Sequence, residues 1–352
     1  MNSIIHERPG VYSSYDAAAS LRGSRAARIV GVAAKSKTGT SNVPVTITSY
    51  EMGLSVFGED DAASPGMSTL LKLLFLGGVY MVSAVAVDGK DYASAFAALQ
   101  SVENVQIVVC DSGELAVQQA LRASLESASA ARRERVAVVG MSGASTVELT
   151  ARAKALNSER IVLVGPDGLD SNGGPLPGVF AAAAVAAAVA ITRDPAIPLN
   201  GSSLYGLGGV SEQYSDNDID LLVRGGVTPL EAVGGVVSPV RGITTRTTTG
   251  GADDTTWREL TTILIVDDVI PTIRQSLRSR FSQAKNTTQT RGAIRSQVIV
   301  ELESKLRAEI IDGYSDVTVS VYEDDPTVCL VEFSFSVAHG LNQIYLTAHI
   351  TI

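Results

Sequence analysis

The sequence is poor in the residues on which most catalytic and metal sites depend. Its 352 residues include two cysteines, three histidines and one tryptophan. His6, His339 and His349 occur in no H-E-x-x-H or C-x-x-C context, so the ligand spacing of a zinc site is missing. Cys110 and Cys329 each lie in an apolar, strand-like run, which favours two buried thiols over a disulfide. We expect no metal and no cofactor.

The chain also lacks a long apolar run and an excess of basic charge. Residues 180–191, FAAAAVAAAVAI, are fewer than the roughly 20 apolar residues that span a bilayer. The start, MNSIIHERPG, has no basic region followed by an apolar core, so we expect no signal peptide. The formal charge of -9 argues against a whole-protein role in nucleic-acid binding. We therefore expect cytoplasmic synthesis, no membrane insertion and no nucleic-acid partner.

Three short segments resemble parts of active-site motifs, and each has a plainer explanation. Residues 139–143, VGMSG, lack the full G-x-G-x-x-G of a dinucleotide loop. Residues 165–168, GPDG, are typical of a surface turn. Residues 216–220, DNDID, lack the central glycine and closing glutamate of a calcium loop and are better explained as a helix cap. We predict that the protein is not an enzyme; a nucleotide-binding α/β enzyme stays the alternative.

What is present is a regular alternation of strand-like and helical patterns. The apolar, β-rich runs cover residues 28–34, 80–87, 105–110, 135–140 and 160–164. The helical patterns between and after them cover residues 68–76, 92–102, 114–131 and 146–157. Apolar strands that alternate with helices are typical of a mostly parallel sheet with helices on both faces. This predicts an α/β domain over residues 28–195.

A second, different pattern follows residues 194–251, which are irregular and rich in glycine, proline, serine and threonine. The predicted elements are helices over residues 267–284 and 292–311 and strands over residues 316–323 and 329–337. Asp267 and Asp268 suit the amino end of the first helix. Helices followed by antiparallel strands form an α+β unit. We therefore predict a mixed fold, α/β plus α+β, with the α+β domain over residues 196–341.

The two ends of the chain are extended segments. Near the carboxyl end an alternation of period two is typical of a half-buried strand. One face of this strand carries Ile344, Leu346, Ala348, Ile350 and Ile352, and the other carries Tyr345, Thr347 and His349. Such a strand must pair, either within its own sheet or with a neighbouring molecule. Near the start, an arm over residues 1–27 contains Pro9, Gly10, Val11 and Tyr12.

One stretch concentrates positive charge in this acidic chain. Residues 271–300 contain no acidic side chain and six basic ones: Arg274, Arg278, Arg280, Lys285, Arg291 and Arg295. A solvated helical face, a nucleic-acid site and a contact with an acidic protein surface would all have this composition. No aromatic residues are interleaved as in nucleic-acid binders. Between the two binding interpretations, charge complementarity favours an acidic protein partner.

The region from Pro177 to Arg246 carries a family resemblance. An alanine-rich helix after Pro177-Gly178 is followed by Asn200-Gly201, by the segment DIDLL at residues 218–222 and by two further motifs. These motifs are Gly226-Val227-Thr228 and Arg241-Gly242-Ile243-Thr244-Thr245. Together with PGVY at residues 9–12, this order resembles the tail sheath proteins of contractile phage tails and related contractile bacteriocins. The resemblance covers most of the chain, although larger relatives insert extra domains for which this chain has no room.

The resemblance implies a structural role. In this family, subunits stack in six-fold rings around an inner tube, with the carboxyl-terminal domain facing the tube and the α/β domain outside. It implies that residues 1–27 and 342–352 add strands to a sheet of another subunit. The implied partners are further copies of the chain, the inner tail tube protein, and the baseplate and tail terminator proteins. The six basic residues would face the tube, and contraction would drive the tube through a target envelope. The sheath would be assembled in the bacterial cytoplasm into a virion tail or a phage-tail-like particle.

Overall fold

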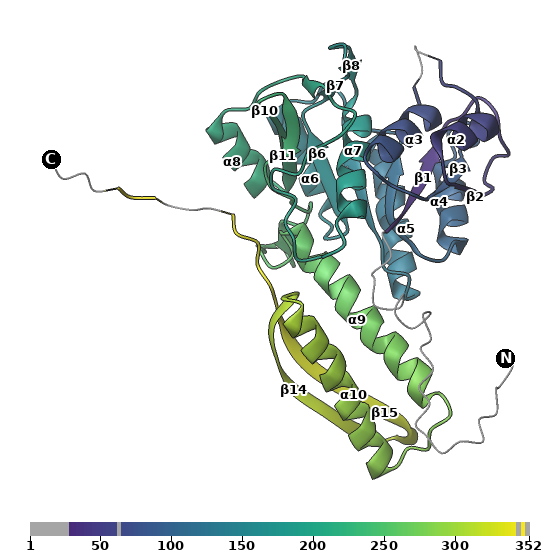
Figure 1. Ribbon diagram of the computed structural model, residues 1–352, viewed down its shortest axis with the longest axis vertical. Helices are drawn as coiled ribbons and strands as arrows, with labels where there is room; N and C mark the ends of the chain where they lie inside the picture. The colour runs from purple at the N-terminus through teal and green to yellow at the C-terminus, as the bar shows by residue number, and fades with distance from the viewer. Residues whose placement is uncertain (1–27, 62–64, 343–345, 349–352) are drawn as a thin grey trace, which may run out of the picture.

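A computed structural model describes residues 28–61, 65–342 and 346–348, and it divides the protein into two parts (Figure 1). The larger part, here called the α/β body, is built around an eight-stranded sheet. The smaller part, here called the helix–hairpin unit, contains two long helices and a two-stranded antiparallel sheet. The predicted mixed fold, a largely parallel α/β sheet followed by an α+β unit, is confirmed.

The main sheet is parallel except at its two edges. Its order is β11-β10-β6-β5-β4-β1-β3-β2, and only β2 and β11 run antiparallel to their neighbours. The strands are β1 (Ile29–Ala34), β2 (Val45–Ile47), β3 (Val82–Ala86), β4 (Val105–Cys110), β5 (Val136–Gly140), β6 (Ile161–Gly165), β10 (Val227–Val233) and β11 (Val236–Pro239). The central strands are buried on both faces, which explains why their sequences do not alternate.

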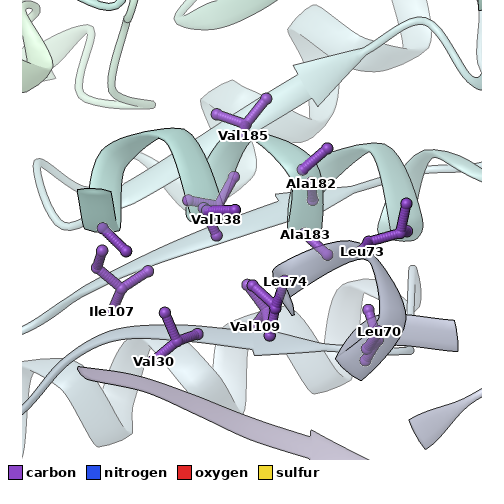
Figure 2. Packing of buried hydrophobic residues seen from close by; sticks show 14 of the residues in the cluster. Val30, Leu70, Leu73, Leu74, Ile107, Val109, Val138, Ala182, Ala183 and Val185 are labelled. Atoms are coloured by element: carbon purple, nitrogen blue, oxygen red, sulfur yellow. The ribbon is translucent and has the colours of Figure 1, made fainter. Parts of the chain in front are cut away.

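Helices cover the sheet on both faces. One core layer contains α2 (Tyr50–Phe57), α3 (Met67–Leu76) and α7 (Gly178–Ile191). The opposite layer contains α4 (Tyr92–Ser101), α5 (Leu115–Ala130), α6 (Thr146–Leu156) and α8 (Asp216–Arg224). The alanines of α7 let it lie close to both the sheet and α3, where Ala182 and Ala183 lie near Leu73, Leu74 and Val138 (Figure 2). A helix apolar all round is fully enclosed, and residues 178–190 are buried.

The main sheet extends past the boundary predicted after residue 195. Strands β10 and β11 come from residues that we predicted to be irregular and placed in the second domain, and β10 pairs with β6 in parallel. The prediction missed β10 because Pro229 interrupts it, and missed β11 because it is short. Gly234 and Gly235, both with positive φ, form the turn between them. Helix α8 begins at Asp216, capped by the Ser215 hydroxyl as the aspartate-rich segment predicted.

Five short strands and the helix–hairpin unit complete the described fold. The small strands are β7 (Gly168–Leu169), β8 (Pro175–Leu176), β9 (Gly209–Val210), β12 (Thr248–Thr249) and β13 (Ala252–Asp253). The helix–hairpin unit contains α9 (Leu260–Phe281), α10 (Thr288–Arg307), β14 (Ile311–Tyr322) and β15 (Asp325–Val337), around a core of its own. None of the described helices is both long and apolar enough to cross a membrane.

Helix α9 begins earlier than the sequence predicted. It starts at Leu260, so Asp267 and Asp268 lie inside the helix and not at its amino end. The prediction was wrong because residues 260–266, LTTILIV, are apolar and β-branched and do not show helical periodicity. A favourable interaction with the helix dipole therefore does not explain why aspartates occur at these two positions.

The junction of the two parts and the surfaces of the helix–hairpin unit

One continuous helix, α9, joins the two parts of the protein. Leu260 and Ile263 in its first turns belong to the core of the α/β body. Ile265, Val269 and Ile273 belong to the core of the helix–hairpin unit. The same helix is thus packed into both cores. Pro271 lies inside α9 and removes one of its backbone hydrogen bonds, but the helix continues through it. We therefore expect α9 to transmit displacement from one part to the other without a flexible linker.

Two ion pairs hold α9 against the α/β body. The Arg160 guanidinium, at the start of β6, binds both carboxylate oxygens of Asp267 at 2.7 and 3.0 Å. The two side chains are only 11% and 14% exposed. Burial acts to lower the pKa of Arg160, but the bond to Asp267 outweighs it and the pKa is raised. Further along α9, Arg274 binds Glu134 at 2.8 Å. Removing one partner of a buried pair is costly, so these contacts fix the position of α9.

A third ion pair holds the two helices of the helix–hairpin unit together. The Lys305 ammonium on α10 lies 2.7 Å from Asp268 Oδ2 and 3.2 Å from the Thr272 hydroxyl, both on α9. Lys305 is buried. The adjacent residues Asp267 and Asp268 thus bind in two directions, one toward the body and the other toward α10.

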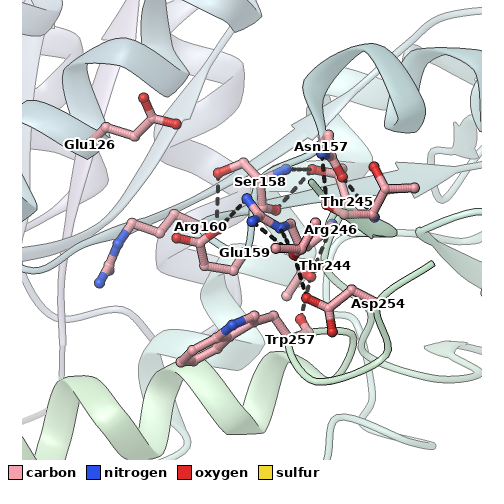
Figure 3. A network of polar contacts seen from close by, with 12 residues as sticks. Glu126, Asn157, Ser158, Glu159, Arg160, Thr244, Thr245, Arg246, Asp254 and Trp257 are labelled. Carbon is pink, nitrogen blue, oxygen red and sulfur yellow. Dashed lines mark hydrogen bonds and ion pairs between the residues drawn. The ribbon is translucent and has the colours of Figure 1, made fainter. Parts of the chain in front are cut away.

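The two family motifs meet at this junction. Figure 3 shows Thr244 and Thr245 of the second motif with Ser158 and Trp257. Gly226-Val227-Thr228 starts β10, and the Thr228 hydroxyl both donates to Ile243 O at 2.9 Å and accepts from Ile243 N at 2.8 Å. The fully buried Thr245 makes the same double contact with the backbone of Ser158, at 3.0 Å each way. Short hydroxyl side chains are suited to such backbone pairing. They join the 241–245 segment to the strands β6 and β10.

The rest of the segment leads to α9. The Thr244 hydroxyl donates to Trp257 O at 2.6 Å, and Arg241 forms an ion pair with Glu259, the residue just before α9. Gly242 O accepts from Leu260 N at 3.1 Å. The Arg-Gly-Ile-Thr-Thr segment therefore sets the position from which α9 begins.

Gly226 and Asn157 also belong to this network, and both have a positive φ. Gly226 has φ +82, and a Cβ there would lie 2.9 Å from Thr247 Cγ2. Asn157 caps α6 in the left-handed region, and its side-chain oxygen accepts from Thr247 N and Thr248 N at 3.0 and 3.2 Å. Left-handed caps favour glycine and asparagine. No pattern in the sequence marked Asn157, Glu134 or Arg160 as functional residues. The aspartates at positions 267 and 268 were noticed, but their binding partners were not predicted.

The six predicted basic residues have different environments. Arg278, Arg280, Lys285 and Arg295 are exposed, whereas Arg274 and Arg291 are half-buried. Arg274 is the residue bound to Glu134, and Arg291 donates to the Asn286 and Thr288 side chains. Arg295 donates to Val317 O on β14 at 2.8 Å. Within the described part of the chain, no acidic side chain forms an ion pair with Arg278, Arg280 or Lys285. These three residues, here called the basic tip, lie in the last turn of α9 and in the turn after it. That end of α9 points away from the body (Figure 1).

The hairpin β14–β15 is a sheet of two strands whose inward face packs on the helices. Val317, Val331, Phe333 and Phe335 belong to or pack against the core that α9 and α10 share. Asn286, in the turn between the helices, donates to Pro326 O at 2.7 Å. Among the described residues no third strand pairs with β14 or β15. Long strands with unpaired edges are able to accept further strands.

The predicted terminal strand has no partner within the described part of this subunit. Leu346 is 91% exposed, Thr347 and Ala348 are exposed, and no strand is formed at these residues. The segment leaves the molecule where Asn342 Oδ1 accepts from Asn200 Nδ2 at 2.9 Å. The other predicted arm residues, Pro9, Gly10, Val11, Tyr12, Ile344, Tyr345, His349 and Ile350, lie outside the described residues.

At the point of the sheet where α/β enzymes bind a nucleotide, side chains of this protein bind one another. Ligands bind such sheets where the strand order reverses, here at β1, which has β3 and β4 on its two sides. At the carboxyl ends of β1 and β4, Asp111 accepts from Lys35 N at 3.0 Å and from the Tyr92 hydroxyl at 2.6 Å. Burial raises the pKa of Asp111 despite these bonds. A Cβ at Gly66 would lie 2.7 Å from Lys35 O, so α3 starts directly against this crevice.

Comparison with known proteins agrees with this architecture. The family described as phage tail sheath protein central domain matches residues 86–245, and the phage tail sheath C-terminal domain matches residues 252–351. The tail sheath protein of Bacillus phage SP01 is 29% identical over 249 residues, or 69% of this chain. This chain spans 42% of the length of that relative.

Solved structures of low sequence identity share the fold. A sheath tail protein from Desulfitobacterium hafniense matches with a TM-score of 0.71 at 12% identity, covering 93% of this chain and 100% of that one. The helical sheath of the anti-feeding prophage in its contracted state matches with a TM-score of 0.72 at 15% identity, over 98% and 99% of the two chains. The fold is thus that of subunits of contractile sheaths. The chain belongs to the phage tail sheath protein family.

Proposed function

We propose that this protein polymerises in six-fold rings around an inner tube and contracts to drive that tube through a target cell envelope. The observation that carries this proposal is a hairpin with unpaired strand edges in a subunit whose own carboxyl-terminal residues 346–348 extend into solvent. Each copy thus has both an acceptor for strands and an extended segment to donate. Self-assembly and a tail role are supported by the family and by the anti-feeding prophage sheath.

In this proposal, the two arms, residues 1–27 and 342–352, each contain a strand that adds to the β14–β15 hairpin of a neighbouring copy. The alternation of Leu346, Thr347 and Ala348 suits a strand with two different faces. Strand addition depends on backbone hydrogen bonds, so the connection persists while the bodies of the subunits rotate. The arms then serve as hinges that keep the polymer connected during contraction.

The basic tip is the surface that we assign to the tube. Arg278, Arg280 and Lys285 project from the end of the helix–hairpin unit with no acidic partner among the described residues. An acidic tube surface would complement them. Exposed ion pairs contribute only about 0.2–1 kcal/mol each, so repetition over many subunits makes attachment firm and still releasable. Arg274 also has a role inside the subunit, because it binds Glu134.

Contraction in this proposal is a mechanical transition that uses energy stored during assembly. The sheath assembles extended between a baseplate and a tail terminator in the bacterial cytoplasm, and a baseplate signal releases it. Subunits then move to a second, more stable packing. The buried ion pairs around α9 support movement of each subunit as one body. A nucleotide-driven alternative has less support, because at the ends of β1 and β4 Asp111 already binds Tyr92 and Lys35 N, and α3 begins close to Lys35.

The test is electron microscopy of the purified full chain at rising concentration, with two variants of Leu346. Leu346→Pro removes a backbone N–H that strand pairing needs, and Leu346→Val keeps it. Because Leu346 is 91% exposed in the single subunit, neither change should alter its melting temperature. We expect hollow striated tubes from the natural chain and from Leu346→Val, and none from Leu346→Pro.

Two results would contradict the proposal. Tubes formed equally well by Leu346→Pro would remove the carboxyl-terminal strand from the assembly. A natural chain that stays monomeric at every concentration, alone and with tube protein present, would exclude polymerisation itself.

A further inference from the structure

A contiguous apolar patch lies on the α3 and α7 side of the α/β body. Leu76 at the end of α3, Tyr80, Ile191 at the end of α7 and Tyr205 are 52%, 46%, 40% and 57% exposed. Distances from two glycines show that these side chains are close to one another. The Cβ position at Gly78 is 3.6 Å from Ile191 Cγ2, and that at Gly206 is 3.4 Å from Leu76 Cδ1. Large side chains grouped in this way mark a binding surface more often than scattered ones do.

The amino-terminal arm leaves the body at the edge of this patch. Arg28 N donates to Ala190 O at 3.3 Å, and its guanidinium donates to Val189 O at 2.8 Å and to Thr192 O at 2.7 Å. Arg28 is therefore fixed to the last turn of α7, directly beside Ile191. The chain that precedes it must start from this point.

The sequence of the arm nearest Arg28 suits such a surface. Residues 16–27, DAAASLRGSRAA, contain one large apolar side chain, Leu21, and two further cations, Arg22 and Arg25. At about 3.4 Å per residue, the intervening segment can carry Leu21 roughly 20 Å from Arg28, which is enough to cross the patch. The carbonyl end of α7 attracts positive charge, so Arg22 and Arg25 are favourable there.

We propose that residues 16–27 bind to the patch on their own subunit, with Leu21 between Leu76 and Ile191. The root of the arm then takes a fixed direction, and only residues 1–15, with Pro9 to Tyr12, stay available for other copies. This limits the free reach of the arm to about 50 Å, which restricts the neighbours that it can join. The inference depends on the contacts of Arg28 and on the patch, and it holds or fails independently of the sheath mechanism.

Disulfide trapping tests the contact in the full-length chain. In a Cys329→Ser background, where the remaining Cys110 is 2% exposed, we would compare Leu21→Cys/Ile191→Cys with Leu21→Cys/Val147→Cys. Val147 is 69% exposed at the start of α6, in the layer on the opposite face of the sheet. We expect intrachain disulfide, read on a non-reducing gel, to form roughly tenfold or more faster in the first pair, because docking raises the effective concentration.

A second measurement separates docking from chance encounter. Leu76→Ser removes apolar contact from an exposed position and should leave the unfolding temperature unchanged. Trypsin cleavage after Arg22 and Arg25 should become about tenfold faster in Leu76→Ser. A factor of this size is expected when much of the contact made by one leucine side chain is lost. Equal disulfide rates in the two cysteine pairs would overturn the proposal. So would disulfides that form only between chains, since these would place a second copy on the patch.

Discussion

At the scale of single residues, Asp60 shows how one carboxylate organises the start of a helix. Its side chain accepts from Gly66 N and Thr69 N, each at 2.8 Å, and from the Thr69 hydroxyl at 2.9 Å. These groups belong to the start of α3, where backbone N–H groups have no partner inside the helix. Burial acts to raise the pKa of Asp60, but the hydrogen bonds to its charged form outweigh burial and lower it from the ordinary 3.8.

This lowered pKa predicts a dependence of stability on pH. Because the folded state favours the charged form, the contribution of Asp60 is complete above pH 3.8 and is lost as the pH falls through its folded-state value. Asp60→Asn should therefore lower the free energy of unfolding by about 1 kcal/mol at neutral pH, and by less in acid. Urea unfolding of both chains at neutral and acid pH measures this. The exposed Asp88→Asn is the control, and an Asp60→Asn loss that stays constant with pH would refute the argument.

At the scale of elements, two glycines have opposite roles, because one lies where α3 packs closely on α7 and the other lies on an open side of α10. A Cβ at Gly77, the cap of α3, would lie 2.4 Å from Ala187 Cβ. At Gly292, in α10, a Cβ would meet nothing within 4 Å. Gly77→Ala should destabilise the protein by about 1–3 kcal/mol through overpacking. Gly292→Ala should stabilise it by about 0.5–1 kcal/mol, because alanine favours the helix.

Thermal unfolding of the two alanine variants checks these opposite signs. The same substitution is made in both, so any general effect of adding a methyl group cancels. A Gly77→Ala variant that unfolds at the same temperature as the natural chain, or at a higher one, would mean that the contact between the end of α3 and α7 does not control stability.

The elements also show what the sequence could and could not predict. The buried strands β1, β3, β4, β5 and β6 were predicted because each is a short apolar run followed by a helical pattern, a local signal. The start of α9 was missed because its β-branched residues are helical only through packing against the body. The bond between Arg160 and Asp267 joins residues 107 positions apart, and no local pattern contains it. The hydroxyls of the 241–245 segment were located by family resemblance, but their backbone partners were not predictable.

At the scale of the whole molecule, the junction couples all the surfaces that would bind other molecules. Helix α9 is packed in both cores and is held to the body by Asp267 and Arg274. The roots of both arms meet the same connection after α7: Arg28 binds Thr192, and Asn342 binds Asn200. A force applied to either arm therefore reaches the body close to the start of α9. Such coupling suits a subunit that moves as one body between two packings.

The whole-molecule charge distribution gives the last prediction. The protein has a net charge of -9, yet the basic tip has no acidic partner among the described residues. Arg278→Glu/Arg280→Glu should abolish co-sedimentation with the inner tube at moderate salt, because two attractive contacts per subunit become repulsive. The control Lys90→Glu/Lys154→Glu changes the net charge equally, at exposed positions of the body, and should still bind.

Salt concentration is the second variable in the same co-sedimentation experiment. Binding by the natural chain should weaken steadily as salt is raised, since exposed charges are screened beyond about 8 Å at physiological ionic strength. Binding by the tip variant should not weaken as salt is raised, because in that variant salt screens a repulsion and not an attraction. If both double variants bind the tube equally, the basic tip does not face it. A different surface of the helix–hairpin unit, most simply the exposed face of β14 and β15, would then make the contact.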